Sequence, residues 1–327
     1  MDENKKKKGS GIFGIFYRDK KETEGVKKGD EFNVLKKPDI KGFFKLLTRR
    51  YNNMLTVNMF YIFGNFPVLF ALFALAGYTS HTSVAPTSAL YTVLKGSSYF
   101  DMTPVTASLN GIFGIQAEMV IPTAATYVFY GLSLLALITF GLVNVGCTYI
   151  IRNIIKGEPV FFWSDFWYAI KRNVKQGIIY GIIDLFLCFM LVYDLFWFRA
   201  NMGVSSTFTF FYFSGFAMIV LHFFVRMYVY PMMITFDLSI FKLIKNGVFF
   251  AVLGIKRNLM CLLGTAVIVA INYAAFVVLM PVGIILPFVI TISLCSFLSV
   301  YCAFPKIKEI MIDPYYKEEK ISKTETD

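Results

Sequence analysis

Apolar residues in this chain come in long blocks separated by short polar segments. The largest block runs from Leu259 to Phe304 and contains no Asp, Glu, Lys or Arg. As one helix it would be about 69 Å long, whereas the hydrocarbon core of a bilayer is about 30 Å thick. The block must therefore fold back on itself, and Met280–Gly283, which contains Pro and Gly, is the expected turn.

Six segments are long and apolar enough to cross a bilayer as tilted helices of roughly 20 residues or more. The predicted spans are 53–76, 125–151, 177–198, 208–231, 259–280 and 282–304. Because the residues before the first span are strongly polar, that span is not expected to be the apolar part of a signal peptide. The pattern predicts an all-α polytopic membrane protein whose six transmembrane helices form three hairpins.

Composition agrees with this pattern and narrows the partners. Hydrophobic residues make up 57% of the chain and charged residues only 16%, whereas soluble domains average about 25% charged residues. The lipid bilayer is therefore the expected surrounding. The net charge of +11 comes from the loops and from a basic tail rather than from a folded basic domain, so nucleic acid is not an expected partner.

The distribution of Lys and Arg predicts the orientation. Most of them precede the first span, lie in 152–176 or 232–258, or follow residue 305. Only Lys95 and Arg199 fall in the segments on the other side. Since basic residues accumulate on the cytoplasmic face, we expect both termini in the cytoplasm of a cell whose plasma membrane the chain crosses.

This topology divides the chain into three parts. We expect a basic cytoplasmic tail over 1–48, a six-helix transmembrane domain over 49–304 and a cytoplasmic tail over 305–327. The loop 77–124, rich in Ser, Thr, Pro and Gly, lies on the outer side.

A short signature repeats at the start of the odd-numbered spans. Asn53, Asn173 and Asn258 each follow basic residues and precede an apolar residue, and the triplet Lys-Arg-Asn occurs twice. Three parallel in–out–in repeats would explain this signature. Topology alone would also place basic residues at a cytoplasmic helix end, so both interpretations stay open.

Ionisable side chains inside the predicted spans are costly and therefore informative. Asp184 lies about 10 Å from the cytoplasmic start of the third span, and Arg226 lies about 8 Å from the end of the fourth. His222 precedes Arg226 by one helical turn, so the three residues can form one polar cluster. Such a cluster can be a substrate, ion or gating site, or a buried pair that fixes helix register. Arg226 can also extend toward the interface by itself.

Motifs for catalysis and cofactors are missing from the sequence. It contains no phosphate-binding loop, no zinc-protease motif and no nucleophile elbow. Two histidines argue against a zinc or haem site, and five cysteines without a CxxC pattern are expected to be small buried hydrophobes. We therefore expect neither an enzyme nor a metal or other cofactor.

The segments that lead into spans three and five combine aromatic and basic residues. In both, a Ser or Asp can cap a helix start, and aromatic and aliphatic residues then suit a helix at the membrane interface. Such a helix can be a lid or can contact a partner. The predicted docking surface is Asp165, Phe166, Trp167, Lys171, Arg172, Asn173, Gln176, Lys256, Arg257 and Asn258.

These residues also carry a resemblance to the YesL-like family of bacterial integral membrane proteins. The similar segments are Arg152–Pro159, Asp165–Gln176, Lys41–Lys45, Val57–Tyr61, Tyr230–Pro231 and Ile255–Asn258, and the resemblance extends over most of 41–312. The loop 77–124 departs from shorter members. The resemblance implies a protein of unknown function associated with carbohydrate uptake, and hence an accessory or regulatory component of a sugar ABC transporter. The alternative is a small-solute transporter that uses the region of Asp184 and Arg226.

Overall fold

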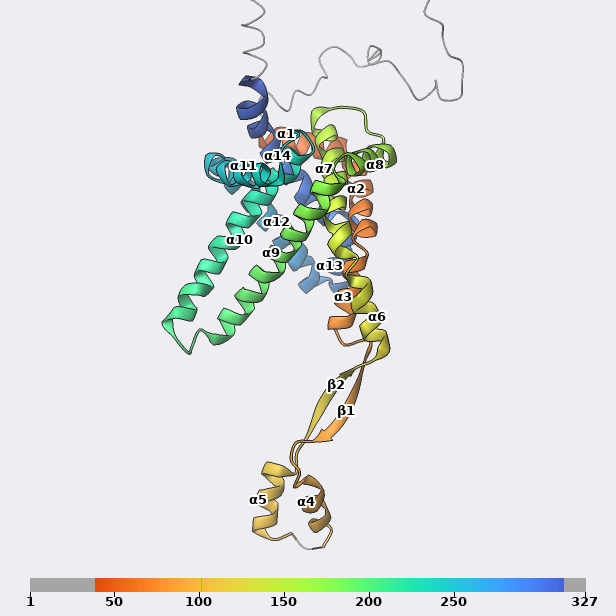
Figure 1. The fold of residues 1–327 in the computed structure, drawn as a ribbon, viewed down its shortest axis with the longest axis vertical. Coiled ribbons are helices and arrows are strands. Elements are labelled where there is room, and N and C mark those ends of the chain that lie inside the picture. The colour runs from red at the N-terminus through yellow and green to blue at the C-terminus, as the bar shows by residue number, and fades with distance from the viewer. Residues whose placement is uncertain (1–38, 101, 315–327) are drawn as a thin grey trace, which may run out of the picture.

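The computed structural model describes residues 39–100 and 102–314 as a bundle of helices with one long extension (Figure 1). The helices outside the extension are α1 (Ile40–Arg49), α2 (Tyr51–Gly64), α3 (Pro67–Leu75), α6 (Ala124–Ser133), α7 (Ala136–Lys156), α8 (Phe162–Arg172), α9 (Val174–Asn201), α10 (Ser206–Met233), α11 (Ile240–Leu253), α12 (Ile255–Val278), α13 (Met280–Leu286), η2 (Pro287–Thr291), α14 (Ile292–Ile307) and η3 (Lys308–Ile312).

The long apolar helices fit a multi-pass membrane protein. Five helical segments are long and apolar enough to cross a membrane, and a sixth is counted when the bent pair α2 and α3 is taken as one span. The predicted spans from residue 125 onward each overlap one of the five. The last two predicted spans are indeed separate helices, but the break between them lies at Leu279 rather than at Met280–Gly283, whose residues form the start of α13.

The first predicted span, 53–76, is not one straight helix. The axes of α2 and α3 differ by 61°, and the break falls just before Pro67. Proline has no N–H and cannot bond to the preceding turn, which explains the break. The amide Nδ2 of Asn65 donates to the carbonyl of Tyr61 at 3.0 Å and so occupies an acceptor near the end of α2.

Three short helices, α1, α8 and α11, lie at one end of the bundle, and each leads directly into a longer helix (Figure 1). A single non-helical residue separates each pair, namely Arg50, Asn173 or Gly254. These residues have similar backbone angles, with φ/ψ of −115/21, −122/22 and −92/15 degrees. We call them the hinge residues and this end of the bundle the hinge end.

The predicted outer loop is an ordered extension, so the expectation of an all-α chain was wrong in this region. Strands β1 (Ser80–Pro86) and β2 (Gln116–Pro122) form an antiparallel β-hairpin in which Ser83 pairs with Met119. The helices α4 (Tyr91–Ser97) and α5 (Pro104–Phe113) lie at its far end (Figure 1). Thr and Val in β1, and Val and Ile in β2, favour extended backbone. At the base, Thr126 Oγ1 donates to the carbonyl of Thr79 at 2.7 Å.

Parts of both predicted tails are helical in the structure. Residues 39–48 of the predicted N-terminal tail form most of α1, because Phe43, Leu46 and Leu47 line one apolar face that packs on the core. The C-terminal boundary at 305 falls inside α14, which continues to a fully buried Ile307. Residues 1–38 and 315–327 of these tails lie outside the described residues.

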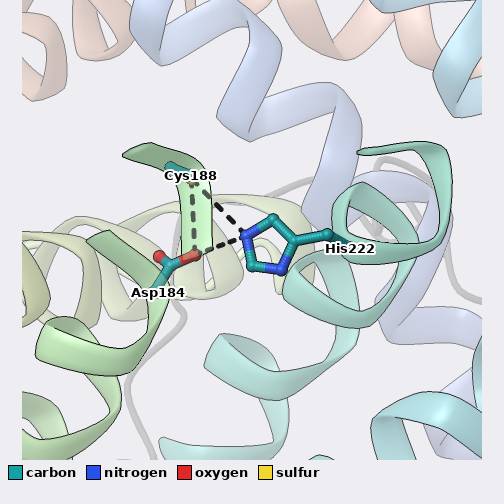
Figure 2. Close-up of side chains that lie close together, drawn as sticks. All are labelled: Asp184, Cys188 and His222. Atoms are coloured by element: carbon teal, nitrogen blue, oxygen red, sulfur yellow. Dashed lines mark hydrogen bonds and ion pairs between the residues drawn. The ribbon is translucent and has the colours of Figure 1, made fainter. Parts of the chain in front are cut away.

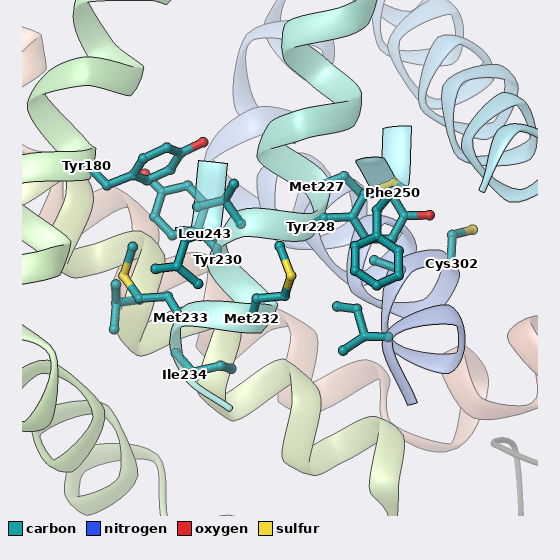
Figure 3. Packing of buried hydrophobic residues seen from close by; sticks show 14 of the residues in the cluster. Tyr180, Met227, Tyr228, Tyr230, Met232, Met233, Ile234, Leu243, Phe250 and Cys302 are labelled. Atoms are coloured by element: carbon teal, nitrogen blue, oxygen red, sulfur yellow. The ribbon is translucent and has the colours of Figure 1, made fainter. Parts of the chain in front are cut away.

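Packing is dense at the hinge end and sparse elsewhere. Figure 3 shows a buried cluster there that includes Tyr228 and Met232 of α10, Phe250 of α11 and Cys302 of α14. By contrast, only 17% of the most apolar window of α9 and 6% of that of α10 are buried inside the protein. The exposed apolar lengths of these helices suit hydrocarbon rather than water.

Candidate functional site

A close glycine contact places α9 against α7. A Cβ atom at Gly141 on α7 would overlap backbone atoms of Gly177 and Gly181 on α9, so only glycine allows this approach. Asn144 follows Gly141 by three residues and Asp184 follows Gly181 by three residues. Because residues three apart share a helix face, the contact brings Asn144 and Asp184 to the same region between the helices.

Asp184 is the centre of a polar network between α9 and α10. Its Oδ2 atom accepts from Arg226 Nε at 2.8 Å and from the Tyr230 hydroxyl at 2.8 Å. Its Oδ1 atom lies 3.1 Å from His222 Nε2 (Figure 2). The Asp184 side chain is fully buried, and such a carboxylate requires a partner of opposite charge. Arg226 supplies it.

The structure thus brings together the three residues predicted to cluster, Asp184, His222 and Arg226. Two further members were missed. Tyr230 follows Arg226 by four residues and Cys188 follows Asp184 by four, so helical spacing alone could have indicated both. The sequence indicates Cys188 only as a small hydrophobic residue. In the structure, the Cys188 Sγ atom lies 3.5 Å from His222 Nε2. Asp184, Cys188 and His222 present possible metal-binding atoms that all lie within 4.8 Å of one another (Figure 2).

Arg226 also faces a cavity. Its Nη2 atom donates to Asn144 Oδ1 at 3.2 Å, which links α10 to α7. About 35% of the Arg226 side chain stays exposed, and Nη1 has no hydrogen-bond partner in the described part of the chain. The guanidinium group can therefore donate to a molecule in the cavity.

The cavity has a volume of about 380 Å³ and lies between α7, α10 and the two interrupted helices. Its lining is mostly apolar, with a few polar side chains. The lining residues are Tyr61, Ile62, Asn65, Val68, Leu69, Phe140, Asn144, Arg226, Pro287, Phe288 and Ile292. Asn65 also lines the cavity, but its Oδ1 atom is buried and has no hydrogen-bond partner within the described residues.

A buried asparagine, Asn58, holds the interrupted helix on the other side of the cavity. Helix η2 has π geometry and begins at Pro287, where the regular ladder of backbone hydrogen bonds is broken. Asn58 Nδ2 donates to the carbonyls of Pro287 at 3.0 Å and Phe288 at 2.7 Å, and its Oδ1 accepts from Ser293 N–H at 2.9 Å. One side chain therefore bonds to three backbone groups at the break, where the regular α-helical pairing is interrupted.

The predicted docking surface is only partly available to a partner. Phe166 is 6% exposed, and its ring packs against that of Phe60 in a tilted arrangement with centroids 4.7 Å apart. The missing side chain of Gly146 leaves room for the Phe166 ring. Asn258 is fully buried: it accepts from the Tyr228 hydroxyl at 2.7 Å and donates to the Ala251 carbonyl at 2.8 Å. Including these two residues in a docking surface was therefore wrong.

The remaining docking residues divide between exposed side chains and structural ones. Trp167, Lys171, Arg172 and Lys256 are exposed, while Arg257 is half-buried. Three others bond to nearby backbone: Asp165 accepts from Phe161 N–H, Asn173 donates to the Ala169 carbonyl, and Gln176 donates to the Leu238 carbonyl. The pKa of the Asp165 carboxyl is raised, because the effect of partial burial exceeds that of the hydrogen bond from Phe161 N–H, which lowers the pKa.

The two Lys-Arg-Asn triplets are not equivalent in the structure. Asn173 is itself the hinge residue between α8 and α9, so Lys171 and Arg172 end the short helix. In the other copy Gly254 is the hinge residue, and Asn258 lies four residues later, inside α12. The shared letters therefore do not mark one shared position.

Comparison with known proteins adds no relative. The sequence matches no protein-family model and no curated protein, and the fold matches no solved structure. Function must therefore be argued from the site.

Proposed function

We propose that this protein is a multi-pass protein of the bacterial plasma membrane, with six spans and with the hinge end on the cytoplasmic side. The distribution of basic residues supports this orientation. Between residues 39 and 314, Lys95 and Arg199 are the basic residues that lie beyond the far ends of the spans, while those at the hinge end are many more. Both chain ends would then lie in the cytoplasm.

The hinge residues support three related units, each made of a short helix followed by a helical hairpin. Arg50, Asn173 and Gly254 occupy the same place in their units and have similar backbone angles. The units would run in the same direction, as parallel repeats do. This correspondence replaces the one drawn from Asn53, Asn173 and Asn258.

Its biochemical role, in our proposal, is membrane transport of a small hydroxylated solute, without chemical conversion. The main observation in support of this role is the cavity beside Arg226. Its volume of about 380 Å³ lies within the range of about 300–1,000 Å³ that is usual for small-molecule sites. The free Nη1 donor of Arg226 suits a hydroxyl group, which can accept its hydrogen bond.

The interrupted helices give further support. Solute sites of secondary transporters are often formed by discontinuous transmembrane helices near the middle of the bilayer. Here both the bent pair α2 and α3 and the π-helical segment η2 contribute residues to the cavity, including Asn65 and Phe288.

The test is uptake of radiolabelled monosaccharides and polyols into liposomes that contain the purified protein. Replacing Leu69, which lines the cavity, by Trp should fill the cavity and abolish uptake without removing the ion pair. Leu75→Trp is the matched control, since Leu75 lies on the same helix and is 71% exposed. Uptake that Leu69→Trp leaves unchanged, or the absence of uptake for the whole panel, would exclude this role.

An accessory role in sugar ABC import is a second candidate, and it follows from the YesL-like resemblance. The observation that favours it is the solvent-exposed face of α8. There Trp163 is 68% exposed and Trp167 is 46% exposed, beside the basic Lys171 and Arg172. Aromatic and Arg side chains are enriched at protein interfaces.

Purification in mild detergent from native membranes separates the two candidates. Co-purification of a permease that is lost in a Trp163→Ala/Trp167→Ala variant would support the accessory role. A protein that purifies alone and transports solute in liposomes would exclude that role.

A further inference from the structure

We propose that Asp184, Cys188 and His222 form a binding site for a zinc-class divalent cation inside the membrane domain. The three donor atoms come from two helices, with Asp184 and Cys188 one turn apart on α9 and His222 on α10 (Figure 2). The proposal does not depend on the solute-binding role, because none of the three residues lines the cavity.

The spacing of the donors fits one tetrahedral ion. Zinc binds sulfur at about 2.3 Å and nitrogen or oxygen at about 2.0–2.2 Å, so tetrahedral geometry requires donor–donor distances of about 3.3–3.6 Å. Here His222 Nε2 lies 3.1 Å from Asp184 Oδ1 and 3.5 Å from Cys188 Sγ. The sulfur lies 3.9 Å from the same carboxylate oxygen. Small side-chain rotations would bring all three distances into this range.

The surrounding residues orient the carboxylate for this task. Arg226 and Tyr230 both donate to Oδ2 of Asp184, which fixes the carboxyl plane and leaves Oδ1 directed at His222 and Cys188. Outer hydrogen bonds of this kind are typical of ligands in metal sites. The positive charge of Arg226 also favours the charged form of Asp184, which is the form that binds a cation.

The chemical types of the donors select the ion. One thiolate, one imidazole and one carboxylate suit Zn²⁺ and similar ions, whereas Ca²⁺ and Mg²⁺ prefer oxygen ligands. Binding would require the Cys188 thiol to release its proton and His222 to carry its proton on Nδ1, so that Nε2 can coordinate. Three protein ligands leave a fourth position for water or another small ligand, as in exchangeable zinc sites.

The experiment uses the full chain in lipid nanodiscs, purified without a histidine tag and stripped with a chelator. After equilibrium dialysis against Zn²⁺, elemental analysis should find one zinc ion per chain. A parallel titration with Co²⁺ should give visible bands of tetrahedral Co²⁺ and a near-ultraviolet thiolate charge-transfer band. Both readouts are made on the unmodified protein and need no variant.

Matched variants locate the site. Cys188→Ser and His222→Gln should each weaken Zn²⁺ binding at least about 100-fold, since even outer partners of metal ligands contribute about 10–100-fold. Cys188→Ser should also remove the charge-transfer band. The controls are Cys295→Ser, at a half-buried cysteine of α14, and His81→Gln, at the other histidine of the chain, in β1; both should bind as the unmodified protein does.

Two results would overturn the proposal. The first is an unmodified protein that binds no zinc and gives no thiolate band with Co²⁺. The second is equal zinc binding by the unmodified protein and by folded Cys188→Ser and His222→Gln, which would place the ion elsewhere.

Discussion

Two walls of the cavity are held in place by different chemistry. On one wall, which we call the charged wall, Asn144 and Arg226 line the cavity and Asp184 lies behind Arg226. On the other, the amide wall, Pro287 and Phe288 line the cavity and Asn58 lies behind them.

In both walls, one buried side chain lies behind the residues that line the cavity and holds those residues in position. Asp184 does so with a full charge, and Asn58 does so with a neutral amide that completes a broken backbone ladder. The charged wall therefore depends on a balance of charges, whereas the amide wall depends on hydrogen-bond geometry. Substitutions that remove each supporting side chain should separate these two kinds of dependence.

The largest effect is expected for Asp184→Ala, which removes the partner of Arg226. The partly buried charge of Arg226 then lacks its partner. Removal of one partner of a buried pair typically costs about 3–5 kcal/mol of the free energy of unfolding, and the partial exposure of Arg226 places the expected loss in the lower half of this range. Denaturant unfolding in detergent, followed by circular dichroism, measures this change. Asp194→Ala on the same helix is the control, because Asp194 forms no ion pair within the described residues. Equal losses for the two variants would contradict a special role of the pair.

A smaller but clear loss is expected for Asn58→Leu on the amide wall. Leucine keeps the volume but leaves Ser293 N–H and the carbonyls of Pro287 and Phe288 without their partner. Since an unsatisfied buried group costs about 1–3 kcal/mol, we expect a loss of about 3 kcal/mol by the same unfolding measurement. Asn53→Leu, five residues earlier on α2 at a half-buried position, should change stability much less. The reverse order would mean that Asn53 is the structural asparagine.

The charged wall is easier to predict from the sequence than the amide wall, and the reason is physical. Asp184 and Arg226 are conspicuous because charges are rare inside apolar segments, and helical spacing adds His222 to them. Asn58 is far less conspicuous, since polar amides occur in many transmembrane helices. Its function depends on a helix more than 200 residues later, which no local pattern can indicate. Two other asparagines within the apolar helices show how little the residue type alone decides: Asn144 bonds to Arg226 of another helix, whereas Asn272 Oδ1 has no hydrogen-bond partner within the described residues.

The same distinction applies to the fold. Length and apolar content were enough to predict the spans from residue 125 onward. They could not predict the 61° bend before Pro67, because a proline can either kink a helix or begin a new one. They also missed the β-hairpin, whose strands are separated by two short helices and so lack the signal of a tight turn.

A moderate loss is expected for Gly181→Ala, which acts on the contact between helices that supports the charged wall. A Cβ atom at this position would overlap backbone atoms of Gly141, which cannot move aside as a side chain can. Overpacking of this kind costs about 1–3 kcal/mol, and it should also separate Asn144 from Arg226. Thermal unfolding in nanodiscs measures the loss. Gly203→Ala is the control, because nothing lies within 4 Å of a Cβ atom placed there. Equal stability of the two variants would show that α7 and α9 can separate without cost.

The smallest effect is expected for Asn173→Ala, and it tests whether the buried setting or the residue type makes an asparagine structural. Asn173 is half-buried and its Nδ2 atom donates to the carbonyl of Ala169 at 2.9 Å, so the loss should be about 1 kcal/mol, the net value of a typical hydrogen bond.

The same unfolding measurement on Asn258→Ala is the comparison. Asn258 belongs to the other Lys-Arg-Asn triplet but is fully buried and bonds to Tyr228 and Ala251, so its loss should approach that of Asn58. Similar losses at Asn173 and Asn258 would restore the equivalence that the two triplets suggest. A clear difference would show that burial behind a helix break, rather than the triplet, determines what an amide contributes in this protein.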